Sequence, residues 1–356
     1  MRVMVTIQHP GHVHFFRHAI RTLEDRGHRV YVFARENEVT SELLDVYGID
    51  HEVLVGPSTS IVSLAAIQAK YELRLFRRAR RIKPDVITAI GGVAAAHVSK
   101  LVRAKSVVFY DTEHAKIITS LAYPFADVIC TPECYDQRIG RRQIRYPGYH
   151  ELAYLHPDRF TPDETVRNRL GLDAEDRLAV CRFSSWDSSH DFGQGGVRDP
   201  AEVVSSLEDA GARVIVSSEI DLPELEGNAN PLSPQWMHDL LAAADVVVSE
   251  GATTAAEAAV LGTPAIYVNT LRMGYTDELE EKHGLLFNFS EDDRHERGLE
   301  FALSLLKYRN ARIWQGRLER LHAGTVDVTD VIVQVLESTD ERALIEPRKV
   351  DTPLDA

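Results

Sequence analysis

Residues 245–269 read DVVVSEGATTAAEAAVLGTPAIYVN, the order of segments expected of a strand, a helix and a second strand. The first apolar run, Val246 to Val248, is short and bounded by polar residues, as a buried parallel strand is. The alanine-rich run from Ala255 to Leu261 favours a helix, which Gly262 ends and Pro264 keeps from continuing. Because a second apolar run follows at once, the stretch predicts a βαβ unit.

The turn between this strand and this helix suits an anionic ligand. Ser249 to Gly251 turn the chain, and Thr253 and Thr254 stand where the helix starts. Free N–H groups at a helix N-terminus favour anions such as a pyrophosphate. Glu257, about one turn further along the helix, is placed to accept hydrogen bonds from ribose hydroxyls. A βαβ crossover with a threonine cap would explain the same spacing without any ligand.

The pattern SxGxxTxxEAxxxGxP in this stretch resembles the nucleotide-sugar motif of GT-B glycosyltransferases and UDP-N-acetylglucosamine 2-epimerases. The resemblance implies that Gly251, Thr253 and Thr254 approach the diphosphate of a nucleotide sugar. It also implies that Glu257 holds the ribose. The motif points to a superfamily of folds and donors, and not to one reaction.

Strand and helix signals alternate along most of the chain, with six strand–helix repeats in the first half and a restart in the second. We therefore expect an α/β fold of two Rossmann-like domains that face a cleft, as in GT-B proteins. The expected boundaries are an acceptor domain at 1–152 and a nucleotide-sugar domain at 153–325. A helix at 326–338 would pack back on the first domain, and the charged residues 339–356 would form a disordered tail.

Residues 146–157 interrupt this alternation with a mixture of aromatic and polar side chains. We expect them to form an ordered connection between the domains that acts as a hinge. Together with the segment 160–163, the connection resembles an archaeal and bacterial family of GT-B-like proteins, the domain of unknown function 354. That resemblance spans most of residues 1–330 and brings no assigned reaction with it.

Composition narrows the class of protein. The chain has 356 residues and a formal net charge of -14, and an acidic surface argues against nucleic acid as a partner. No apolar run approaches the roughly 20 residues that span a bilayer, and no signal peptide is recognisable, so a soluble cytoplasmic protein is expected. The one basic cluster, Arg74 to Lys83, fits the solvated face of a helix or, at most, a peripheral contact with anionic lipid. The three cysteines form no metal-binding pattern and are expected to be free thiols.

The loop after the first predicted strand, residues 8–14, contains three histidines and Gly11. Loops at the carboxyl end of strands bind ligands in open α/β folds. The loop resembles the first glycine-and-histidine loop of GT-B enzymes, although the peptidoglycan glucosaminyl transferase has several glycines there. Because the spacing of His9, His12 and His14 matches no familiar structural zinc site, no metal is predicted.

Two later turns of the first half are expected at the same sheet edge. Gly91 and Gly92 match the double-glycine turn that GT-B acceptor domains place beside the first loop, and tight packing of a helix on a strand would also require glycine. The polar run 111–114 follows a predicted buried strand, where catalytic groups collect. Asp111 and Glu113 are therefore candidate catalytic residues, although capping of the next helix would also explain them.

The loop at 183–199 is longer than a routine connection between a strand and a helix. The resemblance to GT-B enzymes implies that it covers the nucleotide and its phosphates. Arg182 would pair with the diphosphate, and Ser184, Ser185 and His190 would contribute polar contacts. The 2-epimerases carry a His-Arg-Arg-Glu-Asn run here, which this chain lacks.

The leading functional expectation is a nucleotide-sugar-dependent glycosyltransferase that uses a UDP-sugar donor and a sugar or lipid-linked acceptor, without a metal or other cofactor. The base would come from His12, His14, Asp111 or Glu113. One of the two histidines, with His12 favoured, would lie within hydrogen-bonding reach of one of the two carboxylates, directly or through one water. A UDP-sugar 2-epimerase and a non-catalytic nucleotide-sugar-binding protein are the alternatives.

Overall fold

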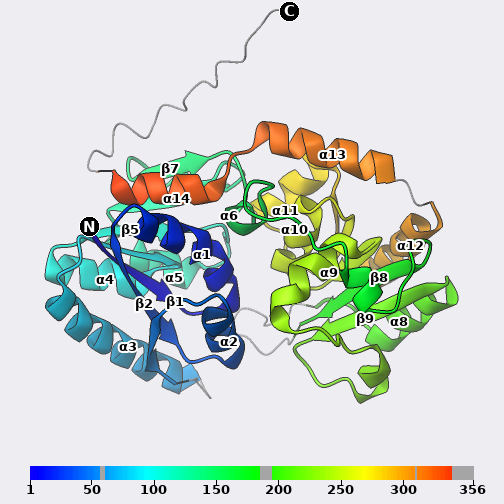
Figure 1. The fold of residues 1–356 in the computed structure, drawn as a ribbon, viewed down its shortest axis with the longest axis horizontal. Helices are drawn as coiled ribbons and strands as arrows, with labels where there is room; N and C mark the ends of the chain where they lie inside the picture. The colour runs from blue at the N-terminus through cyan, green and yellow to red at the C-terminus, as the bar shows by residue number, and fades with distance from the viewer. Residues whose placement is uncertain (57–60, 185–194, 309–310, 339–356) are drawn as a thin grey trace, which may run out of the picture.

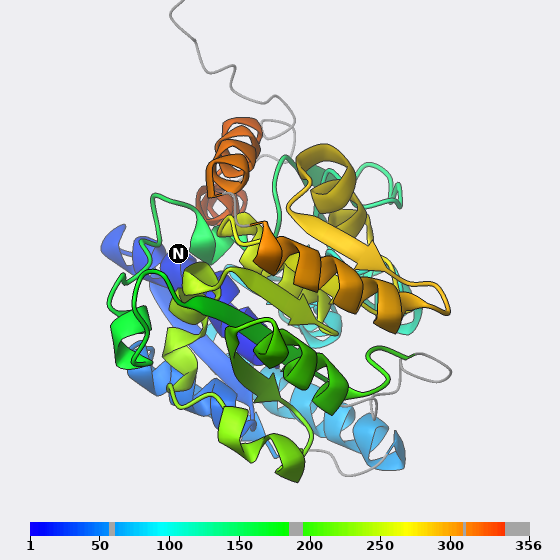
Figure 2. The ribbon, with the colours of Figure 1, turned by 90° about the vertical axis from the view of Figure 1, so that its right-hand side faces the viewer.

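The computed structural model contains two parallel β-sheets, each covered by helices on both faces (Figures 1 and 2). Helices and strands alternate along the chain, so the α/β fold expected from the sequence is confirmed. The structure describes residues 1–56, 61–184, 195–308 and 311–338, without the side chains of 61–65. Ser185, His190 and the tail expected at 339–356 lie outside the described residues.

The first sheet has seven parallel strands in the order β3-β2-β1-β4-β5-β6-β7. Its strands are β1 (Arg2–Ile7), β2 (Arg29–Arg35), β3 (His51–Val55), β4 (Val86–Ile90), β5 (Lys105–Phe109), β6 (Val128–Pro132) and β7 (Gln143–Tyr146). The helices between them are α1 (Pro10–Asp25), α2 (Glu38–Val46), α3 (Ile61–Ile82), α4 (Val93–Val102) and α5 (Lys116–Ala122).

The second sheet has five parallel strands in the order β12-β11-β10-β8-β9. Its strands are β8 (Arg177–Phe183), β9 (Ala212–Ser218), β10 (Val246–Ser249), β11 (Ala265–Val268) and β12 (Leu286–Phe289). Its helices are α8 (Pro200–Asp209), α9 (Met237–Ala243), α10 (Ala252–Val260), α11 (Gly274–Glu278), α12 (Arg294–Lys307) and α13 (Ala311–Gly324), and shorter helical turns are η1 (Pro223–Asn228), η2 (Pro234–Trp236) and η3 (Leu279–His283). The predicted βαβ unit is β10-α10-β11, with β10 and β11 paired as parallel neighbours.

Three local predictions differ from the structure. The first half has a seventh strand, β7, because Gln143 and Arg145 hide its pairing with β6 from a hydrophobicity pattern. Helix α1 begins at Pro10, earlier than expected, because proline is favoured in the first turn and His9 caps the helix by accepting from the N–H of Gly11. His12 and His14 are thus helical residues. Helix α10 begins directly after Gly251, so neither threonine is its N-cap.

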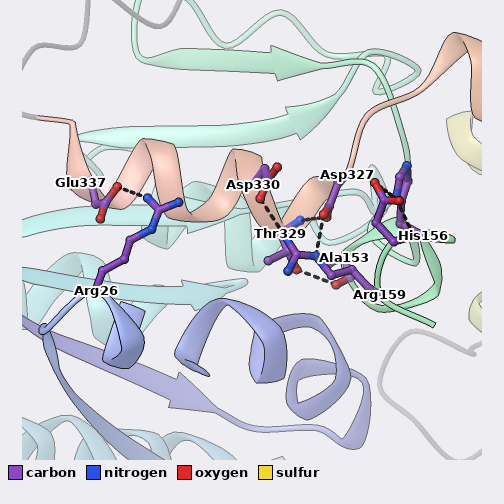
Figure 3. Close-up of polar contacts among 9 residues, drawn as sticks. Arg26, Ala153, His156, Arg159, Asp327, Thr329, Asp330 and Glu337 are labelled. Atoms are coloured by element: carbon purple, nitrogen blue, oxygen red, sulfur yellow. Dashed lines mark hydrogen bonds and ion pairs between the residues drawn. The ribbon is translucent and has the colours of Figure 1, made fainter. Parts of the chain in front are cut away.

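The connection between the sheets runs through α6 (Leu152–Leu155) and α7 (Val166–Arg169). Helix α14 (Val328–Glu337) returns from the second sheet and packs on α1 and α6. Figure 3 shows its attachments: Arg159 pairs with Asp327 at 2.6 Å and with Asp330 at 2.7 Å, and Thr329 Oγ1 donates to the Ala153 carbonyl. The connection is therefore attached to α14 by two ion pairs and a hydrogen bond.

One apolar core runs from the first sheet through α6 and α14 to the face of the second sheet that α10 covers. It includes Phe16 of α1, Leu152 of α6, Ala255 of α10 and Ile332 of α14. Of the helices that the structure describes, none is long and apolar enough to cross a membrane. The shared core holds the carboxyl-end loops of the two sheets face to face.

Candidate functional site

A cleft with a volume of about 1080 Å³ lies between the two sheets. Its first wall comes from the beginning of α1 and includes His9, Gly11 and His14. Its second wall comes from the carboxyl ends of β8 and β9 and from α10, and among the residues predicted from the sequence it contains Arg182, Ser184, Gly251, Thr253, Thr254 and Glu257. The structure therefore brings most of the predicted binding residues to one cavity.

The N-terminus of α10 opens into this cleft. Gly251 is its N-cap in an extended conformation and no side chain caps the helix, while Thr253 is exposed and Thr254 is half-buried. Ser249 has a different place: it is fully buried, and its Oγ lies 3.1 Å from the N–H of Gly251, so it shapes the turn. The first N–H groups of α10 lack intrahelical acceptors, and they can bind an anion in the cleft.

Arg182 is engaged within its own wall of the cleft. Its guanidinium pairs with Glu219 at 2.6 Å and donates to the Ser217 hydroxyl at 2.9 Å. Ser217 lies in β9, the neighbour of β8 in the sheet, and Glu219 directly follows that strand. An anionic ligand in the cleft would thus meet an arginine whose charge Glu219 partly balances.

Glu257, the residue expected to bind the ribose, lines the cleft but is almost entirely buried. Only 6% of the residue is exposed, and its Oε1 accepts from the Tyr154 hydroxyl at 2.8 Å and from His238 Nε2 at 3.0 Å. The His238 ring stands edge-on to that of His14, with 4.5 Å between the ring centroids. Neither Tyr154 nor His238 was among the predicted site residues.

The histidines at the start of α1 all have pKa values below that of a free imidazole. Burial lowers the pKa of His12 to about 3. Loss of contact with water is also the largest cause of the lowered pKa values of His9 and His14. The Nδ1 atom of His9 accepts from the N–H of Gly11, and that of His12 lies 3.4 Å from the N–H of Gln8. Since a neutral imidazole has one donor and one acceptor nitrogen, both rings carry their proton on Nε2.

Asp111 pairs with a histidine, but not with the predicted one. Its Oδ2 lies 2.9 Å from Nδ1 of His150. In the described residues, no direct hydrogen bond joins His12 or His14 to Asp111 or Glu113, so the expected direct contact is absent. The physical reason is the early start of α1, which turns the Nδ1 atom of His12 toward the N–H of Gln8.

The Asp111–His150 pair has the geometry of a base and its orienting carboxylate. Burial raises the pKa of Asp111, but His150 and the Thr112 hydroxyl outweigh that effect and lower the pKa overall. An ionised Asp111 accepts a hydrogen bond from the N–H at Nδ1 of His150, and in the neutral ring this leaves Nε2 as the acceptor nitrogen. This Nε2 is buried and has no hydrogen-bond partner in the described structure.

Glu113 lies where the two domains touch. Burial raises the pKa of its carboxyl group, although the N–H groups of Asp136 and Gly274 oppose the shift. Gly274, the first residue of α11, lies so close that a Cβ atom there would overlap both the Cys134 carbonyl and Glu113. One carboxyl oxygen, Oε2, is buried without a partner in the described residues.

Gly91 and Gly92 are explained by the backbone, and Gly92 also by packing. Both have left-handed backbone conformations, with φ of 73° and 53°. A Cβ atom at Gly92 would overlap Val108 of the neighbouring strand β5. Neither glycine is among the residues that line the cleft as the structure describes it.

Glu250 is a residue of the predicted turn whose role was not foreseen. Its Oε2 accepts from the N–H of Ser184 at 2.8 Å, and its Oε1 accepts from the N–H of Val197 at 2.7 Å. Only 3% of Glu250 is exposed. This single buried carboxylate therefore fixes both ends of the long loop after β8 beside the N-terminus of α10.

Metal-ligating side chains do not gather in the parts of the chain that the structure describes: no group of three or more histidine, cysteine, aspartate or glutamate residues is arranged to hold an ion. The chemistry available in the cleft comes from the α10 amides, Arg182, imidazoles and carboxylates. His9 was visible in the sequence as part of the histidine-rich loop. By contrast, His150, His238 and Glu219 carried no local signal, because each becomes part of the site only through a distant partner.

Solved structures share this architecture. The UDP-GlcNAc 2-epimerase from Neisseria meningitidis, bound to UDP-GlcNAc, is 12% identical with a TM-score of 0.66, over 94% of this chain and 99% of that one. The UDP-GlcNAc 2-epimerase from Methanocaldococcus jannaschii is 13% identical with a TM-score of 0.63, over 94% and 99%. The spinosyn rhamnosyltransferase SpnG, complexed with spinosyn aglycone, is 14% identical with a TM-score of 0.64, over 95% and 100%. These similarities confirm the two-domain GT-B-like fold.

Sequence comparison adds the family. No curated protein matches the chain. A family model described as "Protein of unknown function (DUF354)" matches residues 1–279, which is most of the chain and includes the β10-α10-β11 unit with its turn and Glu257. The expected resemblance is therefore confirmed, and the protein belongs to the DUF354 family.

Proposed function

We propose that this protein is a glycosyltransferase that uses a nucleotide sugar, with UDP-sugar as the expected donor. The observation that carries the proposal is the placement of the open N-terminus of α10, Arg182 and Glu257 in one cleft of about 1080 Å³. A cavity of this size accommodates a nucleotide sugar. The structural relatives include one enzyme bound to UDP-GlcNAc and one transferase complexed with its aglycone, which supports the donor class and an acceptor.

In this proposal the second domain binds the donor. The diphosphate lies at the α10 N-terminus, where amide groups and the helix dipole stabilise its negative charge. Arg182 adds a positive charge as the diphosphate leaves, and Glu257 accepts hydrogen bonds from the ribose. The α10 amides and Arg182 are the groups that stabilise the leaving diphosphate in this proposal, which invokes no metal ion.

The first domain holds the acceptor and supplies the base, which must take a proton from the acceptor hydroxyl. The hydrogen-bond pattern favours His150 over His12, because Asp111 holds the proton of His150 on Nδ1 and leaves Nε2 able to accept one, although neither ring is among the residues that line the cleft as described. His12 carries its proton on Nε2, so it suits hydrogen-bond donation to a sugar or phosphate oxygen. His14 packs against His238 and is the weakest of the predicted bases.

The test compares turnover with donor affinity. His150→Gln and Asp111→Asn should each reduce turnover by about 100-fold or more while donor affinity, measured by calorimetry, stays nearly constant. His12→Asn should change turnover less than either of them. If His150→Gln retains full turnover while His12→Asn loses it, His12 is the base and the assignment from hydrogen bonding is wrong.

A second function, epimerisation of a UDP sugar, is favoured by the carboxyl groups around Asp111. Burial raises the pKa of Glu113, and burial together with Asp111 raises that of Glu151 well above its ordinary value, while the pKa of Asp111 is lowered. Carboxyl groups whose pKa values are pushed apart in this way can abstract and return a proton. None of these three is among the residues that line the cleft as the structure describes it. Incubation with UDP sugars alone separates the functions: an epimerase forms a new sugar nucleotide without acceptor, a transferase at most hydrolyses its donor slowly, and a binding protein does neither.

A further inference from the structure

Glu257 is held by two buried donors that come from different parts of the molecule. His238 belongs to α9 beside the second sheet, and Tyr154 belongs to α6 in the connection between the domains. Both are 2% exposed, and both donate to the same carboxylate oxygen, Oε1. Within the described chain no hydrogen bond reaches Oε2. That second oxygen is therefore the one available to a ligand in the cleft, whose lining includes Glu257.

The rings around Oε1 form one cluster across the domain boundary. The His238 ring lies 5.1 Å from the Tyr154 ring and 4.5 Å from the His14 ring, and the rings of His14 and Tyr154 are 5.4 Å apart. His14 comes from α1 of the first domain. A carboxylate of the second domain is thus oriented by groups whose positions depend on the first.

Tyr154 is itself fixed to the first domain. Its helix, α6, packs on α1 and α14, and the carbonyl of the preceding residue, Ala153, accepts from Thr329 Oγ1 of α14 at 2.6 Å (Figure 3). A change in the angle between the domains that displaces α10 from α6 would separate the Tyr154 hydroxyl from Glu257. The hydrogen bond between them exists only in an arrangement close to the present one.

We infer that Tyr154 and His238 are positioning residues for ribose recognition, and that Tyr154 makes this recognition depend on the interdomain arrangement. The inference rests on the proposed nucleotide site. Two donors on Oε1 fix the rotamer of Glu257 and direct Oε2 toward the cleft. A ligand hydroxyl then meets an acceptor that is already oriented, which avoids the entropic cost of ordering the side chain on binding.

The experiment measures selectivity for the ribose hydroxyls and not only affinity. Binding of UDP, 2′-deoxy-UDP and 3′-deoxy-UDP is measured by calorimetry for the full chain. The wild type should prefer UDP to at least one deoxy analogue by about 10-fold or more, as expected for a hydrogen bond to a charged group. Tyr154→Phe, which removes only the hydroxyl, should reduce that preference by about 3-fold or more. Glu257→Gln should nearly abolish it.

Tyr149→Phe is the matched control. Tyr149 also lies in the connection, is buried, and donates to a glutamate of the second domain, Glu278, at 2.8 Å. It touches α11 and not the donor cleft, so its variant should keep the full ribose preference. Equal losses of preference in Tyr149→Phe and Tyr154→Phe would show a general effect of weakened domain contact and would overturn the specific role of Tyr154.

A second pair of variants tests His238 and guards against misfolding of Tyr154→Phe. His238→Gln keeps an N–H donor near the Nε2 position and should retain the preference, whereas His238→Leu should lose most of it. If Glu257→Gln loses the preference while Tyr154→Phe and His238→Leu keep it, the nucleotide site is correct and the positioning role is wrong. If the wild type binds no nucleotide, or binds UDP and both deoxy analogues equally, the proposed ribose site fails and the inference fails with it.

Discussion

Replacing His12 should make the stability of the protein less sensitive to acid. Burial lowers the pKa of His12 to about 3, whereas the pKa in the unfolded chain is about 6.5. The unfolded state therefore binds more protons than the folded state between these two values. Stability contributed by the neutral ring is complete above the unfolded pKa and is lost as the pH falls from about 6.5 toward 3.

The size of the effect follows from linkage. When the pH falls from 7 to 5, protonation of this histidine in the unfolded chain lowers the free energy of unfolding by about 2 kcal/mol. This figure hardly depends on the folded pKa, because at pH 5 any folded pKa of about 4 or less leaves the ring almost entirely neutral. His9, His14 and His18 also have lowered pKa values, so a variant at His12 should remove only part of the acid sensitivity.

The assay is urea unfolding followed by circular dichroism at pH 5 and pH 7. His12→Asn and His12→Gln should each reduce the stability difference between the two pH values by about 2 kcal/mol relative to the wild type. Agreement between the two variants separates the loss of titration from a change in packing. If both variants show the wild-type difference within about 0.5 kcal/mol, the pKa of His12 is not lowered in the folded protein.

Three further outcomes are expected. Glu250→Ala removes the charged acceptor of two partly buried N–H groups, those of Ser184 and Val197, and should lower the free energy of unfolding by about 2–6 kcal/mol. An unchanged urea midpoint would contradict the role of this residue in fixing the loop ends. Gly92→Ala should lower the free energy of unfolding by about 1–3 kcal/mol, because the backbone there is left-handed and a new Cβ would overlap Val108. Gly227→Ala, where a new Cβ meets no atom within 4 Å, is the control, and both are measured by thermal unfolding. Small-angle scattering should show a smaller radius of gyration with a bound nucleotide, since closure at the connection brings the α1 histidines toward α10; identical curves would mean a rigid interface.

The fold was predictable because its signals are local. The unit β10-α10-β11 is bounded by residues that start or stop an element, so its strands appear within one residue of the predicted positions. Strand β7 was missed because it has few apolar residues and is recognisable only by its pairing with β6. The start of α1 was placed too late, since a histidine cap followed by proline is a weaker signal than a serine or aspartate cap.

The site was predictable in its backbone and less so in its side-chain pairs. The turn at Gly251 and the acid at Glu257 follow from spacing along one helix, and both line the cleft. The partner of Asp111 could not be deduced, because His150 reaches it from the connection between the domains after the whole first sheet has formed. The same holds for Tyr154 at Glu257, where the contact depends on how two domains meet.

The return of α14 to the first domain has a consequence for synthesis on the ribosome. Domains generally fold in order of their emergence, with the N-terminal one first. Here the first domain needs α14, whose Asp327 and Asp330 bind Arg159 and whose apolar residues complete the core around α1 and α6. Since α14 is translated after every strand of the second sheet, the nascent first domain must wait with an apolar face uncovered while its neighbour is made. The contacts of α14 with α1 and α6 can therefore form only after the second domain has been made.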